Sequence, residues 1–224
     1  MSCENAVKWF EKAAARGNAE AKIKLDSYRN IEKGKNNDAV SGLPKDYIDL
    51  GLPSGLKWAK CNIGANKPEE YGDYYAWGEI ESKKEYSIET YIHINKEGSW
   101  SRFWNGMYML LGDIGEKEYD VARNKWGDNW RLPTRAEFQE LKDCCIWEWT
   151  IWNGKCGYMV TSKKNGNAIF LPANGRYNGT SLMEQENCGN YWSASPASVI
   201  KPDCSYCLHI NNRSVCVQLG ARVD

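Results

Sequence analysis

The sequence predicts an α+β fold in which short helices precede a series of antiparallel strands. Helical spacing of apolar residues is confined to short segments, near residues 5–28 and after Thr134. Alternation of apolar and other residues dominates the end of the chain, at Tyr206–Asn211 and Val215–Arg222. Helices followed by a run of strands are typical of this class. With 224 residues, 42% of them hydrophobic, the chain can bury one core and carry a small appendage.

The N-terminal segment predicts a helical hairpin over residues 1–28. Apolar residues, including Trp9 and Phe10, follow helical spacing on either side of a break at Gly17. Residues 5–28 resemble one unit of the Sel-type repeats, which are relatives of tetratricopeptide repeats. No second copy follows, and such units need neighbours to bury their faces. The segment is therefore interpreted as a remnant or a docking helix pair, with a peptide-binding array as the alternative.

A polar segment punctuated by Gly and Pro at residues 29–46 predicts a linker, so the main domain is expected to span residues 47–224. It opens with a hairpin at Tyr47–Trp58, turned at a Pro-Ser-Gly sequence, and continues with an aromatic-rich loop region over residues 66–99. A weak helix is expected at Glu116–Asn124.

A stronger helix follows Thr134, which forms a capping box with Glu137 three residues later. The helix is expected to end near Cys144. Its buried side is expected to include Ala136, Phe138 and Leu141. Short strands are then expected at Gly157–Ser162, Ala168–Leu171, Gly189–Ser193, Tyr206–Asn211 and Val215–Arg222.

Composition excludes several function classes. Twenty-nine basic residues balance 29 acidic ones, so the chain has no net field for a nucleic acid or an anionic membrane. No apolar run approaches the roughly 18 residues that span a bilayer, and the N-terminus has no signal-peptide core. The nine cysteines, an odd number at uneven spacing, are expected to be mostly reduced thiols.

In the two terminal strands, every second residue is apolar, whereas the residues between them are of mixed types. Tyr206, Leu208 and Ile210 are apolar and alternate with Cys207 and His209, which share no chemistry. Strand alternation places the two sets on opposite faces, so one face is expected to pack on the core and the other to face outward.

Several distinctive motifs follow one another over residues 47–224: Tyr47–Ala59 (YIDLGLPSGLKWA), Pro68–Glu79 (PEEYGDYYAWGE), Trp126–Thr134 (WGDNWRLPT), Thr161–Pro172 (TSKKNGNAIFLP) and Tyr191–Ser193 (YWS). Together they resemble the Fibrobacter-type major paralogous domain, a branch of the formylglycine-generating-enzyme-like C-type lectin fold found in gut Bacteroidetes. The resemblance implies a C-type lectin-like fold with small antiparallel sheets and long loops. In the family a further closing strand follows the position of Arg222, and no residues up to Asp224 match it.

Some proteins of this fold are the variable proteins of diversity-generating retroelements, in which adenine-directed mutagenesis rewrites codons at the 3′ end of the gene. The resemblance implies a ligand-binding variable face within residues 197–224, an unknown protein or cell-surface ligand, and a cytoplasmic or phage-particle-associated protein. Randomising both adenines of a pyrimidine-ending Asn codon cannot yield Lys, Gln, Glu, Met or Trp. In that window only Lys201 and Gln218 belong to this forbidden set.

The candidate ligand-binding residues are Tyr206, Cys207, His209, Asn211, Arg213, Cys216, Gln218, Leu219, Gly220, Ala221, Val223 and Asp224. Arg222 matches a framework position of the family, which implies an internal side chain, although it could also be a binding anchor. The alternative is a fixed-sequence domain of the same family with a structural or interaction role.

Chemical alternatives have weaker support in the sequence. Cys204, Cys207, His209 and Cys216 are zinc-type ligands, but nothing fixes Cys204 beside the others. A lectin-type calcium site would need an oxygen ligand where Lys201 stands. A formylglycine-generating-type oxidase is the second alternative, but its copper-binding cysteine pair is not recognisable. We therefore expect a binding module rather than an enzyme, with no catalytic residue, metal or cofactor.

Overall fold

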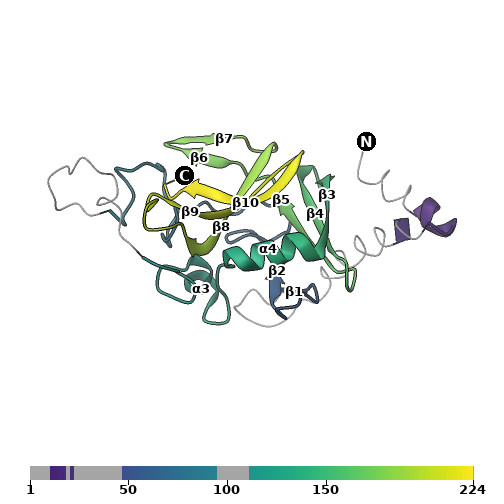
Figure 1. Ribbon diagram of the computed structural model, residues 1–224. Helices are drawn as coiled ribbons and strands as arrows, with labels where there is room; N and C mark the ends of the chain where they lie inside the picture. Colours follow the sequence, from purple (N-terminus) through teal and green to yellow (C-terminus); the bar gives the residue numbers. More distant parts are fainter. Residues whose placement is uncertain (1–10, 19–20, 23–46, 95–110, 224) are drawn as a thin grey trace. The chain divides into compact units, whose positions relative to one another are not determined.

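The computed structural model describes residues 11–18, 21–22, 47–94 and 111–223 as a mixed α+β protein with several small antiparallel sheets and few short helices (Figure 1). The elements are β1 Tyr47–Asp49, β2 Lys57–Ala59, α3 Val121–Trp126, α4 Arg135–Cys144, β3 Cys145–Trp152, β4 Lys155–Ser162, β5 Ala168–Pro172, β6 Arg176–Asn178, β7 Ser181–Met183, β8 Cys188–Pro196, β9 Cys204–Asn211 and β10 Ser214–Ala221. Two compact units divide the chain. The first comprises Met1–Tyr71 with Glu140–Pro172, and the second comprises Gly72–Gln139 with Ala173–Asp224.

The first unit contains the pair β1-β2 and the three-stranded sheet β3-β4-β5. One face of that sheet carries a buried cluster that includes Trp152, Met159 and Phe170. At Gly157 of β4 the neighbouring strand approaches so closely that a Cβ atom would lie 2.3 Å from the carbonyl oxygen of Leu171. Only glycine therefore fits at this crossing of β4 and β5.

Side-chain hydrogen bonds attach the β1-β2 hairpin to the rest of the first unit. Ser162 Oγ donates to the carbonyl oxygen of Leu50 at 2.6 Å. Two amides beyond β4, Asn165 Nδ2 and Asn167 Nδ2, donate to the carbonyl oxygen of Asp49 at 2.9 and 2.7 Å. These bonds satisfy backbone acceptors that a two-stranded hairpin leaves unpaired.

The second unit contains the sheet β10-β9-β8 and the small hairpin β6-β7. Its core includes two clusters, one of which joins the long loop region to this sheet. In one, Trp77 and Ile114 of the loop region pack with Ala194 of β8. In the other, Tyr86 and Tyr91 pack with partly buried neighbours from elsewhere in the unit.

Asp120, which is fully buried, organises the segment around α3. Its carboxylate accepts the backbone N–H groups of Ala122 at 2.9 Å and Arg123 at 3.2 Å, which caps the helix. It also accepts the N–H group of Leu132 at 2.9 Å and that of Glu116 at 3.3 Å. Burial raises the pKa of Asp120 and these backbone donors oppose that rise. The charge is thus compensated by four backbone dipoles.

The helix after the predicted capping box is confirmed. Thr134 N donates to Glu137 Oε2 at 2.7 Å and Glu137 N donates to Thr134 Oγ1 at 3.2 Å. Phe138 and Leu141 are buried as expected, but the prediction for Ala136 is wrong, because it is exposed. Ala136 lies about 200° around the helix from Phe138, since successive residues are about 100° apart.

Other boundaries differ from the expectation. The helix expected at Glu116–Asn124 is displaced, since α3 spans Val121–Trp126 and begins after the Asp120 cap. Strands β3, β6 and β7 were not expected; β3 follows α4 without an intervening turn residue, so no breaker signals it. In the N-terminal segment, residues 11–15 and 21–22 are helical, and the predicted linker at 29–46 lies outside the described residues.

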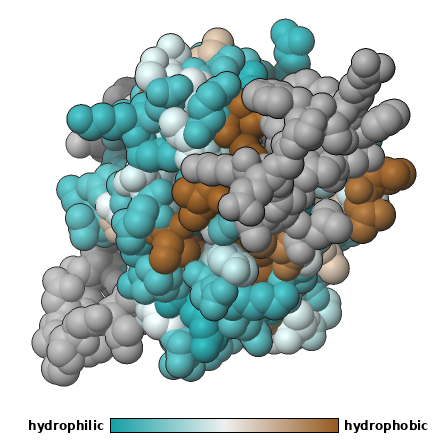
Figure 2. Space-filling model, turned by 90° about the vertical axis from the view of Figure 1, so that its left-hand side faces the viewer, coloured by the Kyte–Doolittle hydropathy of each residue, from teal (hydrophilic) through white to brown (hydrophobic). Residues whose placement is uncertain are grey.

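None of the helices within the described ranges has the length and apolarity that crossing a bilayer requires. On the face drawn in Figure 2, hydrophobic residues reach the surface as separate patches between hydrophilic ones. The most exposed aliphatic side chains of the described residues, Val199 and Ile200, are 72% and 74% exposed.

Replacing Asp120 tests its role in the second unit. Asp120→Asn exchanges one acceptor oxygen for a donor and leaves buried N–H groups unpaired, so we expect the free energy of unfolding to fall by about 2 kcal/mol. Asp128→Asn is the matched control, because the Asp128 side chain pairs with Arg123 but is 84% exposed. We expect this substitution to lower the free energy of unfolding by less than about 0.5 kcal/mol. Urea denaturation followed by tryptophan fluorescence measures both. Equal effects of the two substitutions would contradict this role of Asp120.

Candidate functional site

Most of the candidate residues lie on β9 and β10 of the sheet β10-β9-β8, in which β9 is the central strand (Figure 1). Register pairs place His209 opposite Asn190 of β8 and Cys216 of β10. Paired residues project from the same side of a sheet. We call this side the polar face, and its residues are Cys188, Asn190, Trp192, Ser205, Cys207, His209, Asn211, Ser214, Cys216, Gln218 and Gly220.

The opposite side of the sheet, here called the apolar face, carries Leu208 and Ile210, both fully buried. Three candidate residues project from this side and not from the polar face. Tyr206 pairs with Leu219, and Ala221 follows Leu219 by two residues in β10. The candidate residues predicted from the sequence are therefore divided between the two faces of the sheet. The reason is that the candidates in β10 include both odd-numbered and even-numbered positions, which project from opposite faces.

Trp192 covers one end of the polar face. Its indole Nε1 donates to the carbonyl oxygen of Tyr75 at 2.9 Å, which holds the ring in place. A Cβ atom at Gly220 would lie 3.1 Å from this ring and 3.3 Å from the Cys207 sulfur, and Cys207 is only 2% exposed. The predicted outward position of Cys207 is therefore wrong, and a side chain at Gly220 would require the Trp192 ring to shift. Adjacent indole packing, which strand alternation does not reveal, is the reason.

The residues after β10 turn into the second unit. Val223 is half-buried and packs against the cluster around Tyr86 and Tyr91, so part of this candidate side chain faces the interior. Arg222 is 2% exposed, which agrees with the framework position that the resemblance implied. Asp224 lies outside the described residues.

Arg222 fixes the end of β10 to the loop region. Its guanidinium stacks 4.2 Å from the Trp77 ring centroid, and its Nε donates to Ser205 Oγ at 3.0 Å and to the carbonyl oxygen of Cys204 at 3.2 Å. Its own carbonyl oxygen accepts the Trp77 N–H at 2.8 Å. Burial lowers the pKa of Arg222, but an arginine remains protonated at any ordinary pH.

A hydrogen-bonded chain crosses the middle of the polar face. His209 Nδ1 lies 3.0 Å from Asn190 Oδ1, and His209 Nε2 lies 3.2 Å from Asn211 Nδ2. Asn211 Oδ1 in turn accepts the backbone N–H groups of Arg213 and Ser214, each at 2.9 Å. Burial is the main cause that lowers the pKa of His209 from its ordinary value of 6.5. These two candidate residues are thus bonded within the sheet.

The exposed side chains lie along β10 and at the β9-β10 turn. Arg213 and Gln218 are exposed, and Cys216 is half-buried with its sulfur 3.3 Å from Gln218 Oε1. Asn212 and Ser214 are also exposed here. Sequence reasoning missed these two, although a two-residue connection between alternating strands is a signal of an exposed turn.

The border of this surface includes an ion pair that the sequence did not indicate. Arg176 of β6 donates to Glu184 at 3.2 Å, and both charges act on His209. The Arg176 hydrogen bond lowers the pKa of Glu184, so this carboxylate is ionised at neutral pH.

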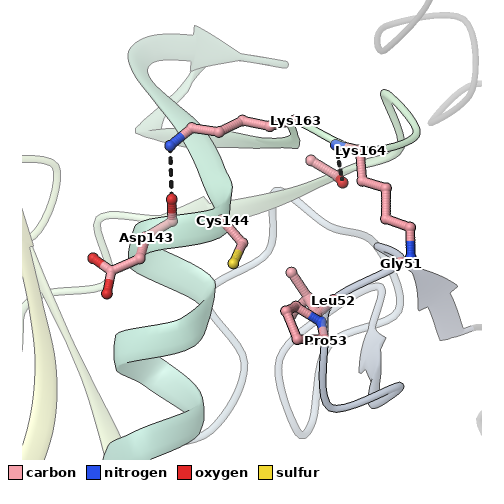
Figure 3. Close-up of a pocket in the computed structure, with 8 residues that line it drawn as sticks. Gly51, Leu52, Pro53, Asp143, Cys144, Lys163 and Lys164 are labelled. Carbon is pink, nitrogen blue, oxygen red and sulfur yellow. Dashed lines mark hydrogen bonds between the residues drawn. The ribbon is translucent and has the colours of Figure 1, made fainter.

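A cavity of about 380 Å³ lies elsewhere, in the first unit, and contains none of the predicted site residues (Figure 3). Leu52 and Pro53 supply apolar lining, and Cys144, Lys163 and Lys164 lie around them. Lys163 Nζ donates to the carbonyl oxygen of Asp143 at 2.7 Å, which neutralises part of the C-terminal charge of α4.

Metal chemistry has no support in the described ranges, which contain no group of three or more His, Cys, Asp or Glu residues placed to hold an ion. The eight cysteines that the structure describes are free thiols. Burial raises the pKa of Cys188 on the polar face to about 11, so it is protonated at neutral pH.

Comparison of the chain with protein-family models, curated proteins and solved structures found no match.

Arg222→Lys tests the role of the buried guanidinium. Lysine keeps the charge but cannot stack in the plane of Trp77 while donating to Cys204 and Ser205, so we expect the free energy of unfolding to fall by about 3 kcal/mol. Arg213→Lys, the same change at an exposed position, is expected to alter it by less than about 0.5 kcal/mol. Urea denaturation measures both, and a tolerated Arg222→Lys would show that the stack contributes little.

Proposed function

We propose that this chain is a non-catalytic binding module on a C-type lectin-like scaffold, as its sequence motifs suggest, and that the β9-β10 hairpin contacts its ligand. The observation that carries the proposal is the contrast along one strand pair. Arg222 and Trp192 fix one end of β10, whereas Arg213 at the β9-β10 turn and Gln218 in the strand are exposed and Cys216 between them is half-buried. A rigid backbone with exposed, chemically mixed side chains is suited to recognition.

We define the hairpin surface as Asn212, Arg213, Ser214, Cys216 and Gln218, with the partly exposed His209 at its border. Its members offer amide, hydroxyl and guanidinium groups, which adapt to polar partners. Arginine, exposed here at position 213, is among the residue types enriched at the centres of protein interfaces. A protein or cell-surface ligand is therefore the partner class that we propose.

The variable-protein hypothesis is compatible with this surface, but fewer positions could vary than the sequence alone suggests. Substitution at Cys207, Gly220 or Val223 would disturb packing, so diversification would be tolerated only at the hairpin surface and its border. The fixed-sequence alternative is favoured by one observation. His209 and Asn211 form specific bonds that cap the β9-β10 turn, and random replacement would lose them.

A pair of displayed libraries tests the binding scaffold. Randomising Arg213, Cys216 and Gln218 should leave most variants resistant to protease, because none of the three side chains is fully buried, and selection against a purified globular protein such as serum albumin should enrich binders. Randomising Cys207, Gly220 and Arg222 is the matched control and should leave few resistant variants. A hairpin-surface library that loses folding, or that folds but never yields a binder, would refute the proposed role.

Sequencing the 3′ end of the gene across a source population distinguishes the variable protein from the fixed domain. A retroelement predicts codon differences confined to adenines of a nearby template repeat, beside a reverse-transcriptase gene. Within the hairpin surface, Arg213 and Cys216 should vary. Gln218 should not vary, because randomising the adenines of a pyrimidine-ending Asn codon cannot yield Gln. An invariant 3′ end without that repeat would establish the fixed-sequence alternative.

A further inference from the structure

The orientation of each group in the His209 chain follows from its backbone donors. Asn211 Oδ1 accepts two N–H groups, from Arg213 and Ser214, so the other end of this amide, Nδ2, is the one directed at His209. An amide nitrogen donates only, and His209 Nε2 must therefore be the unprotonated acceptor. The imidazole proton then resides on Nδ1 and is donated to Asn190 Oδ1 at 3.0 Å.

A second proton on His209 is incompatible with this arrangement. It would occupy Nε2, which faces the Asn211 Nδ2 donor at 3.2 Å. Two donors cannot share a hydrogen bond, so the Asn211 amide would have to rotate and present its oxygen to the imidazolium. Rotation directs Nδ2 at the N–H groups of Arg213 and Ser214, and both lose their bond to the Asn211 side-chain oxygen.

Charged and titratable groups around His209 come from every strand of the sheet and from the neighbouring hairpin. Glu184 raises the pKa of His209 and Arg176 lowers it, and the two offset each other as an ion pair. The thiols that share the polar face are Cys188, Cys207 and Cys216. Glu184 is ionised throughout the range in which histidine titrates, because its own pKa is lowered. His209 is the imidazole of this set, and burial places its protonation below pH 6.5.

We infer that His209 is a proton-operated switch for the β9-β10 turn: the neutral imidazole holds Asn211 in the orientation that caps the turn, and protonation at Nε2 releases the backbone N–H groups of Arg213 and Ser214. The turn carries the exposed Arg213 and Asn212, so the switch controls the order of the hairpin surface. It operates whether or not that surface binds a ligand.

The direction of the pH dependence follows from burial. The folded state holds His209 below its ordinary pKa of 6.5. The unfolded chain therefore binds the proton first as the pH falls, and the stabilising contribution of neutral His209 is complete above about pH 6.5. It is lost as the pH falls further through the lower pKa of the folded state.

Hydrogen exchange and nitrogen NMR on the full chain test the switch between pH 7.5 and the pH at which the imidazole nitrogens titrate. We expect the Nδ1–H tautomer at pH 7.5, and a fall of about fivefold or more in the protection of the Arg213 and Ser214 amides on protonation. The amides of Leu208 and Ile210 in the strand centre should keep their protection. A different tautomer, or a parallel loss of protection at Leu208 and Ile210, overturns the inference.

Two variants provide the matched controls. His209→Gln removes the titrating group, and we expect the protection of Arg213 and Ser214 to become independent of pH. Asn211→Asp should reverse the sign, since one carboxylate oxygen can cap the turn while the other accepts the imidazolium proton. Its turn should be at least as protected at pH 5.5 as at pH 7.5. An Asn211→Asp protein that opens on acidification as the parent does overturns the inference even if His209→Gln does not fold.

Discussion

The stacking of the Arg222 guanidinium on Trp77 is the contact on which the second unit depends. A buried cation is costly to desolvate, and the cost is offset only where a π-face and hydrogen-bond acceptors surround it. Here Trp77 supplies the π-face, and Cys204 and Ser205 supply the acceptors. The indole Nε1 of Trp77 donates to the Ser193 carbonyl oxygen at 2.8 Å. One ring thereby connects the loop region to β8, β9 and the end of β10.

Aromatic hydrogen bonding explains how a loop-rich region can be buried. Segments without regular secondary structure leave carbonyl oxygens that need donors. Tyr86 Oη donates to the Tyr74 carbonyl oxygen at 2.6 Å, and Tyr91 Oη donates to that of Trp77 at 2.7 Å. Tyrosine and tryptophan fill apolar volume and donate at one end, whereas phenylalanine cannot. The chain accordingly has thirteen Tyr and eleven Trp against four Phe.

The same use of aromatic side chains limits the proposed binding surface. Trp192 is fixed by its bond to Tyr75 and covers Cys207 and Gly220, so that half of the polar face belongs to the interior. The remaining half is made of groups that are exposed or bonded to one another through His209. The surface available to a partner is thus small and lies toward the β9-β10 turn. Its order depends on local hydrogen bonds more than on the core.

Local patterns in the sequence determined the α+β class, the α4 capping box and the terminal strand pair, because periodicity and capping depend on neighbours within a few residues. Only the tertiary structure decided which side chains of that pair are outside. Cys207 and His209 have the same parity, yet the distant Trp192 covers one and not the other. Arg222 and Val223 likewise turn inward to meet rings more than a hundred residues away. Burial is a property of non-local packing, and a strand's own alternation cannot specify it.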